Sequence, residues 1–141
     1  LIVIGLNKND IDIALPFECT FTGYITNDTT LANIYSAADV FVAPYLEDNF
    51  PNTVLESMAC GTPVVGFNAG GIPEMIDHKT NGYLSDPLSS HDLAKGIEWV
   101  LSDAQLHPEL CLQARKKVES NYTYSIIADK YIEVYRGNNI E

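Results

Sequence analysis

Cations, cysteines and long apolar runs are scarce in this sequence, and each shortage excludes a class of protein. Lysine and arginine number 8 against 19 aspartates and glutamates, for a formal net charge of −11. So acidic a surface repels nucleic-acid backbones and anionic lipid headgroups, and we expect neither nucleic-acid binding nor polybasic membrane anchoring. No apolar run approaches the ~18 residues that a membrane span needs. Three scattered cysteines, Cys19, Cys60 and Cys111, make neither a disulfide framework nor a zinc cluster, and we expect them reduced and buried.

What is present is the composition of one globular domain. The chain has 141 residues, of which 46% are hydrophobic and 19% charged, and this length is typical of one domain rather than two. The apolar run 1–5 begins at Leu1 and is typical of a buried strand already under way. We therefore expect residues 1–141 to be one domain of a longer protein.

Strand and helix patterns alternate along the first 90 residues. The apolar runs predict strands over 1–5, 19–23, 39–44, 63–66 and 82–84, and the helical spacings predict helices over 28–38, 53–60 and 73–77. From Ser90 onward only helices are expected, the last two over 108–120 and 125–136. This order predicts an α/β fold, in which a Rossmann-like parallel sheet has helices on both faces and a C-terminal helical cap.

Parallel sheets of this kind bind ligands at the carboxyl ends of their strands, here the loops after residues 5, 23, 44 and 66. The dinucleotide pattern G-x-G-x-x-G and the phosphate-binding pattern G-x-x-x-x-G-K-[ST] are both absent from the sequence. Nicotinamide-dependent dehydrogenases and P-loop enzymes are thus disfavoured. His78, His91 and His107 lie in polar surface regions, and none is a persuasive catalytic base.

The polar loop after residue 44 and the helix that follows form the candidate ligand site. Free backbone N–H groups at 52–54 and the positive end of the helix dipole predict a site for a phosphate or a carboxylate. Glu56, one turn along, could accept two hydrogen bonds from a vicinal diol, and Asp48 could approach the same ligand from the other side. The adjacent Gly70 and Gly71 would let a second loop form the opposite lip of one crevice.

Each of these residues also has a purely structural interpretation. Thr53 and Glu56 have the spacing of a capping box, in which Glu56 would bond back to the N–H of Thr53. Asp48, followed by Asn49, could be only a turn former. Gly61 is expected at the end of the helix.

Four runs between Ala38 and Leu84 carry a family resemblance: ADVFVAP (38–44), DNFPNTVLESMACGTPVV (48–65), GGIPE (70–74) and NGYL (81–84). This region strongly resembles the carboxy-terminal domain of glycosyltransferase family 4, whose members are retaining GT-B-fold enzymes that use nucleotide-sugar donors. A weaker resemblance extends from Phe21 to the final helix. The resemblance implies that the chain is one half of a GT-B fold.

The resemblance also implies a role for individual residues. Glu56 matches the acid that binds the ribose hydroxyls, and Asp48 matches the catalytic acid beside the sugar, where the family more usually has glutamate. Backbone groups of the helix start would face the diphosphate and sugar, and base contacts would come from around Tyr24. The implied substrate-binding residues are therefore Glu56, Asn52, Thr53, Val54, Phe50, Pro51, Gly23 and Tyr24, with no metal and no cofactor.

The implied full-length enzyme is a cytoplasmic hexosyltransferase that moves a sugar from a nucleoside diphosphate to an acceptor such as a lipid-linked or surface polysaccharide. Family members carry an arginine and a lysine for the pyrophosphate on a first strand and loop, and an amino-terminal acceptor domain that can also meet the inner face of the membrane. We expect these parts to lie outside residues 1–141, which alone should be inactive. A GT-B-fold sugar-nucleotide epimerase and a non-catalytic nucleotide-sugar-binding module remain the alternatives.

Overall fold

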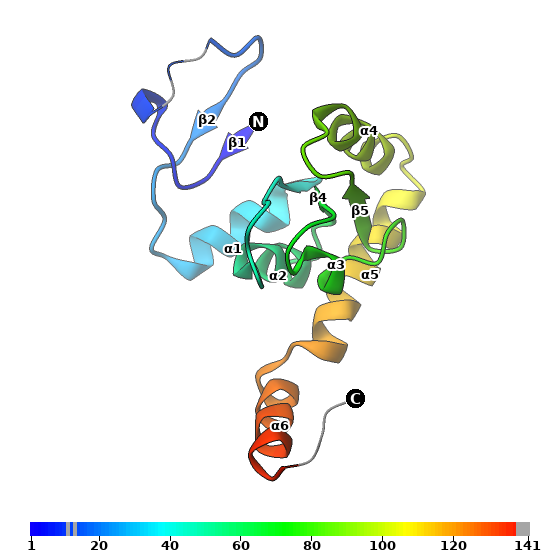
Figure 1. Cartoon of the computed structure of the whole chain (residues 1–141). Coiled ribbons are helices and arrows are strands. Elements are labelled where there is room, and N and C mark those ends of the chain that lie inside the picture. Colours follow the sequence, from blue (N-terminus) through cyan, green and yellow to red (C-terminus); the bar gives the residue numbers. More distant parts are fainter. Residues whose placement is uncertain (11, 13, 138–141) are drawn as a thin grey trace. The chain divides into compact units, whose positions relative to one another are not determined.

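Short parallel strands and longer helices alternate along the chain and fall into two units, Leu1–Ile34 and Tyr35–Glu141. The computed structural model describes residues 1–10, 12 and 14–137. The boundary between the units falls inside helix α1 (Asp28–Ala37), so Tyr35 belongs to the second unit (Figure 1). No helix in the described part of the chain is long and apolar enough to cross a membrane.

The first unit contains a two-stranded parallel sheet. Strand β1 (Ile2–Val3) pairs with β2 (Thr20–Phe21), and the 3-10 helix η1 (Lys8–Asp10) lies between them in sequence. The expected central, buried strand over 1–5 is wrong in length and burial, because β1 has two residues and Ile2 is 47% exposed. Within the described residues β1 has one strand neighbour, so one of its edges has no partner strand.

The second unit is built on a three-stranded parallel sheet of order β3-β4-β5. Its strands are β3 (Phe41–Ala43), β4 (Val64–Phe67) and β5 (Gly82–Ser85), in a register that pairs Val65 with both Val42 and Tyr83. Its further helices are α2 (Asn52–Ala59), α3 (Ile72–Met75), α4 (Ser90–Leu101), α5 (Leu106–Asn121) and α6 (Tyr124–Tyr135).

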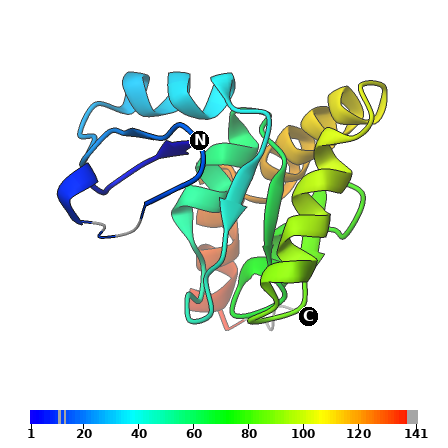
Figure 2. The same cartoon turned by 90° about the horizontal axis from the view of Figure 1, so that it is seen from above.

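Helices cover both faces of this sheet because side chains alternate along the central strand β4. Val64 packs into a core with residues of α2, α3 and α5, whereas the next residue, Val65, packs against Val100 of α4 on the other face. Figure 1 shows α4 on one side of the strands and α2, α3 and α5 on the other, and in Figure 2 α4 runs in front of the sheet. The predicted α/β fold with a parallel sheet and helices on both faces is confirmed.

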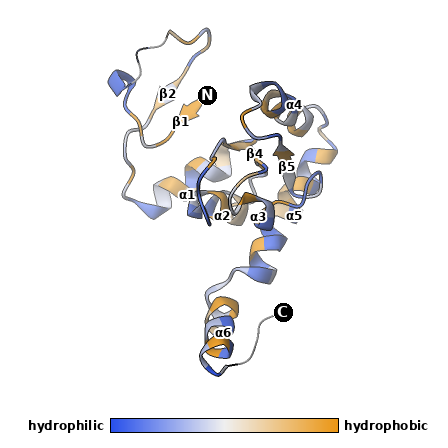
Figure 3. Cartoon of the chain, viewed as in Figure 1, coloured by the Kyte–Doolittle hydropathy of each residue, from blue (hydrophilic) through white to orange (hydrophobic). Residues whose placement is uncertain are grey.

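Three details differ from the sequence-based expectation. The paired strands form two sheets, one in each unit, rather than one. The expected cap is made by α4 and α5, whereas α6 has no buried residue and exposes apolar side chains such as Ile132 and Val134. Figure 3 shows hydrophobic stretches along α6 in orange. The three cysteines are free, as expected, but half-buried rather than buried.

Candidate functional site

The candidate site is the loop 44–51 and the start of α2, which follow the carboxyl end of β3. Asp48 organises the loop, since its Oδ1 accepts a hydrogen bond of 3.0 Å from the N–H of Phe50. Its backbone oxygen accepts a second bond, of 2.8 Å, from the N–H of Gly71. Asp48 is therefore the turn former that its sequence context predicts, and its carboxylate is exposed on the loop.

The two adjacent glycines approach this loop itself. A side chain on Gly70 would overlap the carbonyl oxygen of Asp48, and one on Gly71 would overlap that of Asn49 and lie 2.6 Å from its carbonyl carbon. Gly70 also has φ of +56°, a conformation that favours glycine. The expectation that these glycines make room for a ligand is thus corrected, because what they make room for is the backbone of 48–50.

An aromatic contact holds the next residue of the loop. The ring of Phe50 meets that of Tyr122 edge-on, with centroids 5.5 Å apart, and Phe50 remains 38% exposed. The Tyr122 hydroxyl donates a 2.9 Å hydrogen bond to the carbonyl oxygen of Glu74. Tyr122, at the end of α5, therefore links the loop to α3.

The first turn of α2 presents unpaired backbone donors. Pro51 is buried and stands at the N-cap, and no side chain caps the helix. Within the described residues, no acceptor faces the N–H groups of Asn52 and Thr53, so both are open to an anion at the positive end of the helix dipole. The expectation of a free N–H at 54 is wrong, because Val54 donates to the carbonyl oxygen of Pro51 at 3.1 Å.

The predicted capping box does not form. Because the helix starts at Asn52, Thr53 lies inside its first turn, and its hydroxyl is hydrogen-bonded to the hydroxyl of Tyr45 at 3.2 Å. The exposed Glu56 carboxylate instead accepts a hydrogen bond from the hydroxyl of Tyr35, with Oε2 at 3.4 Å. Burial, and then the negative charge of Glu56, raise the pKa of Tyr35 well above the usual tyrosine value, so this hydroxyl stays protonated and donates.

Sequence reasoning missed the two tyrosines. Tyr35 lies on the apolar face of a helical pattern, where an aromatic residue indicates only core packing, and Tyr45 follows a strand. The single signal that could have pointed to them is the hydroxyl group, which needs a partner when it is buried.

The remaining predicted site residues lie in the first unit. Gly23 is buried and has φ of +63°, and an added Cβ would lie 2.8 Å from Oδ1 of Asn7. Its N–H donates to the carbonyl oxygen of Leu6 at 3.0 Å, whereas Tyr24 is 86% exposed. Gly23 therefore serves a tight turn, and Tyr24 offers an exposed ring.

Two of the histidines have structural partners. Nδ1 of His78 accepts a 3.0 Å hydrogen bond from the N–H of Leu84, and Nε2 of His107 lies 2.7 Å from the carbonyl oxygen of Asp39. These contacts tie His78 to β5 and His107 to the segment before β3. No group of three or more metal-ligating side chains is found in the described ranges 1–10, 12 and 14–137.

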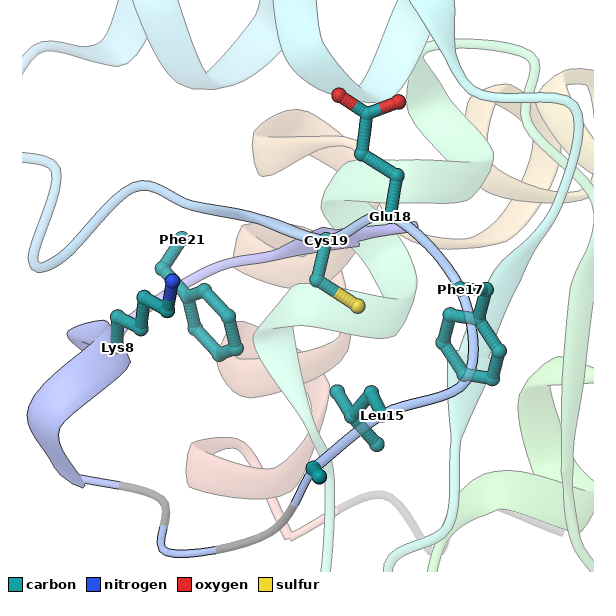
Figure 4. A pocket seen from close by; sticks show the side chains of 7 residues that line it. Lys8, Leu15, Phe17, Glu18, Cys19 and Phe21 are labelled. Carbon is teal, nitrogen blue, oxygen red and sulfur yellow. The ribbon is translucent and has the colours of Figure 1, made fainter.

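A hollow of about 430 Å³ is lined by residues of the first unit. Apolar side chains make up much of its wall, and Figure 4 shows the Glu18 carboxylate turned away from Leu15, Phe21 and Cys19. Among the described residues of the wall, Lys8 is the one cation. The hollow lacks the converging polar groups expected of a site for an anionic ligand.

A parallel α/β sheet with a polar loop and an uncapped helix start after one of its strands defines a ligand-binding domain of the Rossmann-like class. The sequence model of "Glycosyl transferases group 1" matches residues 1–103, and the chain belongs to this family, whose fold is GT-B. It is similar to an uncharacterized glycosyltransferase of Methanocaldococcus jannaschii, with 37% identity over 119 residues, 84% of this chain and 30% of that protein.

Solved structures are also similar to this chain. The HepE protein of Anabaena in complex with UDP matches with a TM-score of 0.77 and 25% identity, over 84% of this chain and 32% of that chain. The same protein in complex with UDP-glucose also matches. The C-terminal domain of a glycosyl transferase group 1 family protein from Francisella tularensis matches with a TM-score of 0.67 and 29% identity, over 75% of this chain and 54% of that chain. The chain thus spans about a third of the length of several of its relatives.

Proposed function

We propose that residues 1–141 are the carboxy-terminal, donor-binding domain of a retaining hexosyltransferase of glycosyltransferase family 4. The observation that carries the proposal is the match to HepE, which is described in complexes with UDP and UDP-glucose, together with the uncapped start of α2 after β3. Family membership favours a transferase over a sugar-nucleotide epimerase or a non-catalytic binding module. The particular family 4 motifs, over 38–84, support the finer assignment.

In this proposal the diphosphate of the donor lies against the first turn of α2. The N–H groups of Asn52 and Thr53 would donate to its oxygens, and the helix dipole would stabilise the negative charge that develops as the diphosphate leaves. Val54 is buried and its N–H is already bonded, so we assign it a supporting role in packing the turn.

The two acids act on different parts of the donor. Glu56, exposed one turn along α2, would accept hydrogen bonds from the two ribose hydroxyls. Asp48, on the loop, would lie beside the sugar and stabilise positive charge at its anomeric carbon. Gly23 and Tyr24 would contact the base, and Phe50 and Pro51 would line the sugar side.

The larger protein would supply what this domain lacks. The match to a structure described as a C-terminal domain, and the share of its relatives that the chain spans, support an additional amino-terminal domain that binds the acceptor. We propose a cytoplasmic enzyme that needs neither metal nor cofactor and that meets a lipid-linked or surface saccharide through that other domain.

The experiment is a binding measurement on the complete gene product that contains residues 1–141. Calorimetric titration with UDP, GDP, ADP and CDP identifies the preferred diphosphate, and Glu56→Gln should then weaken its binding by about 1.5–3 kcal/mol, the range for a lost hydrogen bond to a charged group. Glu98→Gln, which removes one charge from an exposed position on α4, is the matched control and should bind normally.

Product analysis separates the alternatives. Incubation with the corresponding nucleotide sugar and a saccharide acceptor should release the nucleoside diphosphate and transfer the sugar to an acceptor hydroxyl as a glycoside with retained anomeric configuration. A second nucleotide sugar as the product would indicate the epimerase, and binding without turnover by the complete protein would indicate the non-catalytic module. Normal affinity in Glu56→Gln would contradict the ribose role.

A further inference from the structure

A buried tyrosine, Tyr35, is hydrogen-bonded to Glu56 of the proposed site. Tyr35 is 2% exposed, and its hydroxyl is directed at the carboxylate of Glu56, 3.4 Å from Oε2. We propose that Tyr35 is a positioning residue, whose hydroxyl holds the Glu56 carboxylate in the orientation that receives the ribose hydroxyls of a nucleoside diphosphate. The inference rests on the proposed function, since it concerns the ligand assigned there to Glu56.

The position of the Tyr35 hydroxyl is fixed from two sides. The Tyr35 ring meets the ring of Phe41 on β3 edge-on, with centroids 5.5 Å apart and planes at 85°. The carbonyl oxygen of Tyr35 accepts a 2.6 Å hydrogen bond from the buried hydroxyl of Thr62. A donor anchored by both its ring and its backbone is a rigid reference point for a flexible, exposed side chain.

The hydroxyl itself needs an explanation that packing does not give. Phenylalanine would fill the same space, whereas burying a phenol costs free energy unless its O–H finds an acceptor. The acceptor here is Glu56, which lies 21 residues away on another helix and whose head remains exposed. The bond thus joins a core residue to a side chain that can still reach a ligand.

Pre-orientation matters because a free glutamate loses rotamer entropy when a ligand fixes it. A bond of 3.4 Å is long, so it restrains the direction of the carboxylate while leaving its other lone pairs available. Tyr45 does the same for the adjacent turn by holding the hydroxyl of Thr53 at 3.2 Å. Two tyrosine hydroxyls thus restrain the side chains of Thr53 and Glu56 at the start of α2.

The test is a mutant cycle on the complete gene product, with Tyr35→Phe, Glu56→Gln and the double variant. The probes are the diphosphate that binds the wild type most tightly among UDP, GDP, ADP and CDP, its 2′,3′-dideoxy counterpart, and inorganic pyrophosphate. Tyr83→Phe is the matched control, because the Tyr83 hydroxyl also donates to a carboxylate, that of Asp92 at 3.2 Å, at a place remote in sequence from α2.

Tyr35→Phe should weaken binding of the ribose-containing diphosphate about 2- to 12-fold, less than Glu56→Gln does, because Tyr35 acts on the ligand only through Glu56. Binding of the dideoxy compound and of pyrophosphate should not change, and the double variant should bind no more weakly than Glu56→Gln alone. Tyr83→Phe should bind all three probes as the wild type does.

Other results overturn the inference, and they are distinguishable from a failure of the proposed function. Equal weakening of all three probes, additive losses in the double variant, unchanged affinity in Tyr35→Phe, or a Tyr35→Phe protein that does not fold would make Tyr35 a structural residue only. If the wild type binds no diphosphate, or if Glu56→Gln binds normally, the proposed function itself fails and the inference fails with it.

Discussion

Gly71→Ala should displace the candidate site without straining its own backbone. Gly71 has φ of −87°, which alanine adopts freely, so the substitution costs nothing through conformation. Its new methyl group would overlap the carbonyl oxygen of Asn49 and lie 2.6 Å from the carbonyl carbon. Because these atoms are backbone, the loop 48–50 must move, and overpacking of this kind costs about 1–3 kcal/mol.

Gly61→Ala, at the end of α2, is the comparison variant: it strains its own backbone but displaces no neighbouring atom. Gly61 has φ of +80°, but the nearest atom to an added Cβ is the carbonyl oxygen of Cys111 at 3.8 Å. Alanine at this position would destabilise the fold by about 1–2 kcal/mol, because it must adopt the left-handed conformation, and its methyl group would clash with no neighbouring atom. The two variants therefore have comparable stability costs and different geometric consequences.

Hydrogen–deuterium exchange and diphosphate affinity, measured together on the complete gene product, separate the two. In Gly71→Ala, exchange at the amides of 48–50 and 71–76 should accelerate about 5- to 150-fold, the equivalent of 1–3 kcal/mol, and affinity should fall roughly 10- to 100-fold as the loop shifts. In Gly61→Ala, exchange should accelerate at the end of α2 while affinity stays near that of the wild type. Wild-type loop exchange in Gly71→Ala, or an equal loss of affinity in Gly61→Ala, would refute the reasoning.

Two further outcomes are expected from the proposed chemistry. Asp48→Asn keeps an oxygen that can accept the 3.0 Å bond from the N–H of Phe50, so the fold and diphosphate affinity should persist while turnover falls at least roughly tenfold; full turnover would remove Asp48 from the reaction. Treatment of the complete protein with a chelator should leave its turnover unchanged, because neither acid is needed for a metal in this proposal; activity lost and then restored by Mg²⁺ or Mn²⁺ would contradict it.

Local patterns in the sequence predicted the positions of the helices and strands of the second unit well. Apolar periodicity from Ser90 onward corresponds to α4, α5 and α6, and Gly61 adopts the left-handed conformation expected after the end of α2. Such features depend on neighbours three or four residues away, which a single sequence displays directly. The extent of the strand expected over 1–5 and the packing of α6 depend instead on which distant segments contact them. For these two elements the expectations were wrong.

The candidate site shows the same limit at the level of single side chains. The spacing of Thr53 and Glu56 fits a capping box, and the local rule would have been sufficient if the helix began two residues later, with Thr53 at the N-cap. With Pro51 at the N-cap, both side chains instead bond to tyrosines from elsewhere in the chain. Likewise, the adjacent Gly70 and Gly71 correctly indicated that another group comes close to the backbone there. They did not indicate that this group is the backbone of 48–50, because sequence spacing does not identify the partner.

Charge gives a physical reason why this domain should need a second part for its proposed substrate. The loop and helix carry three carboxylates, Glu47, Asp48 and Glu56, and no lysine or arginine occurs between residues 44 and 59. A helix start offers about half a positive charge, which is less than the single negative charge on each phosphate group of a nucleotide sugar. Two unpaired N–H groups can orient the diphosphate, but they do not neutralise it within a chain of net charge −11. In the function proposed above, cations outside residues 1–141 would hold the diphosphate. The complete gene product should then bind it more tightly and with a stronger salt dependence than residues 1–141 alone, and equal affinity of the two would contradict this.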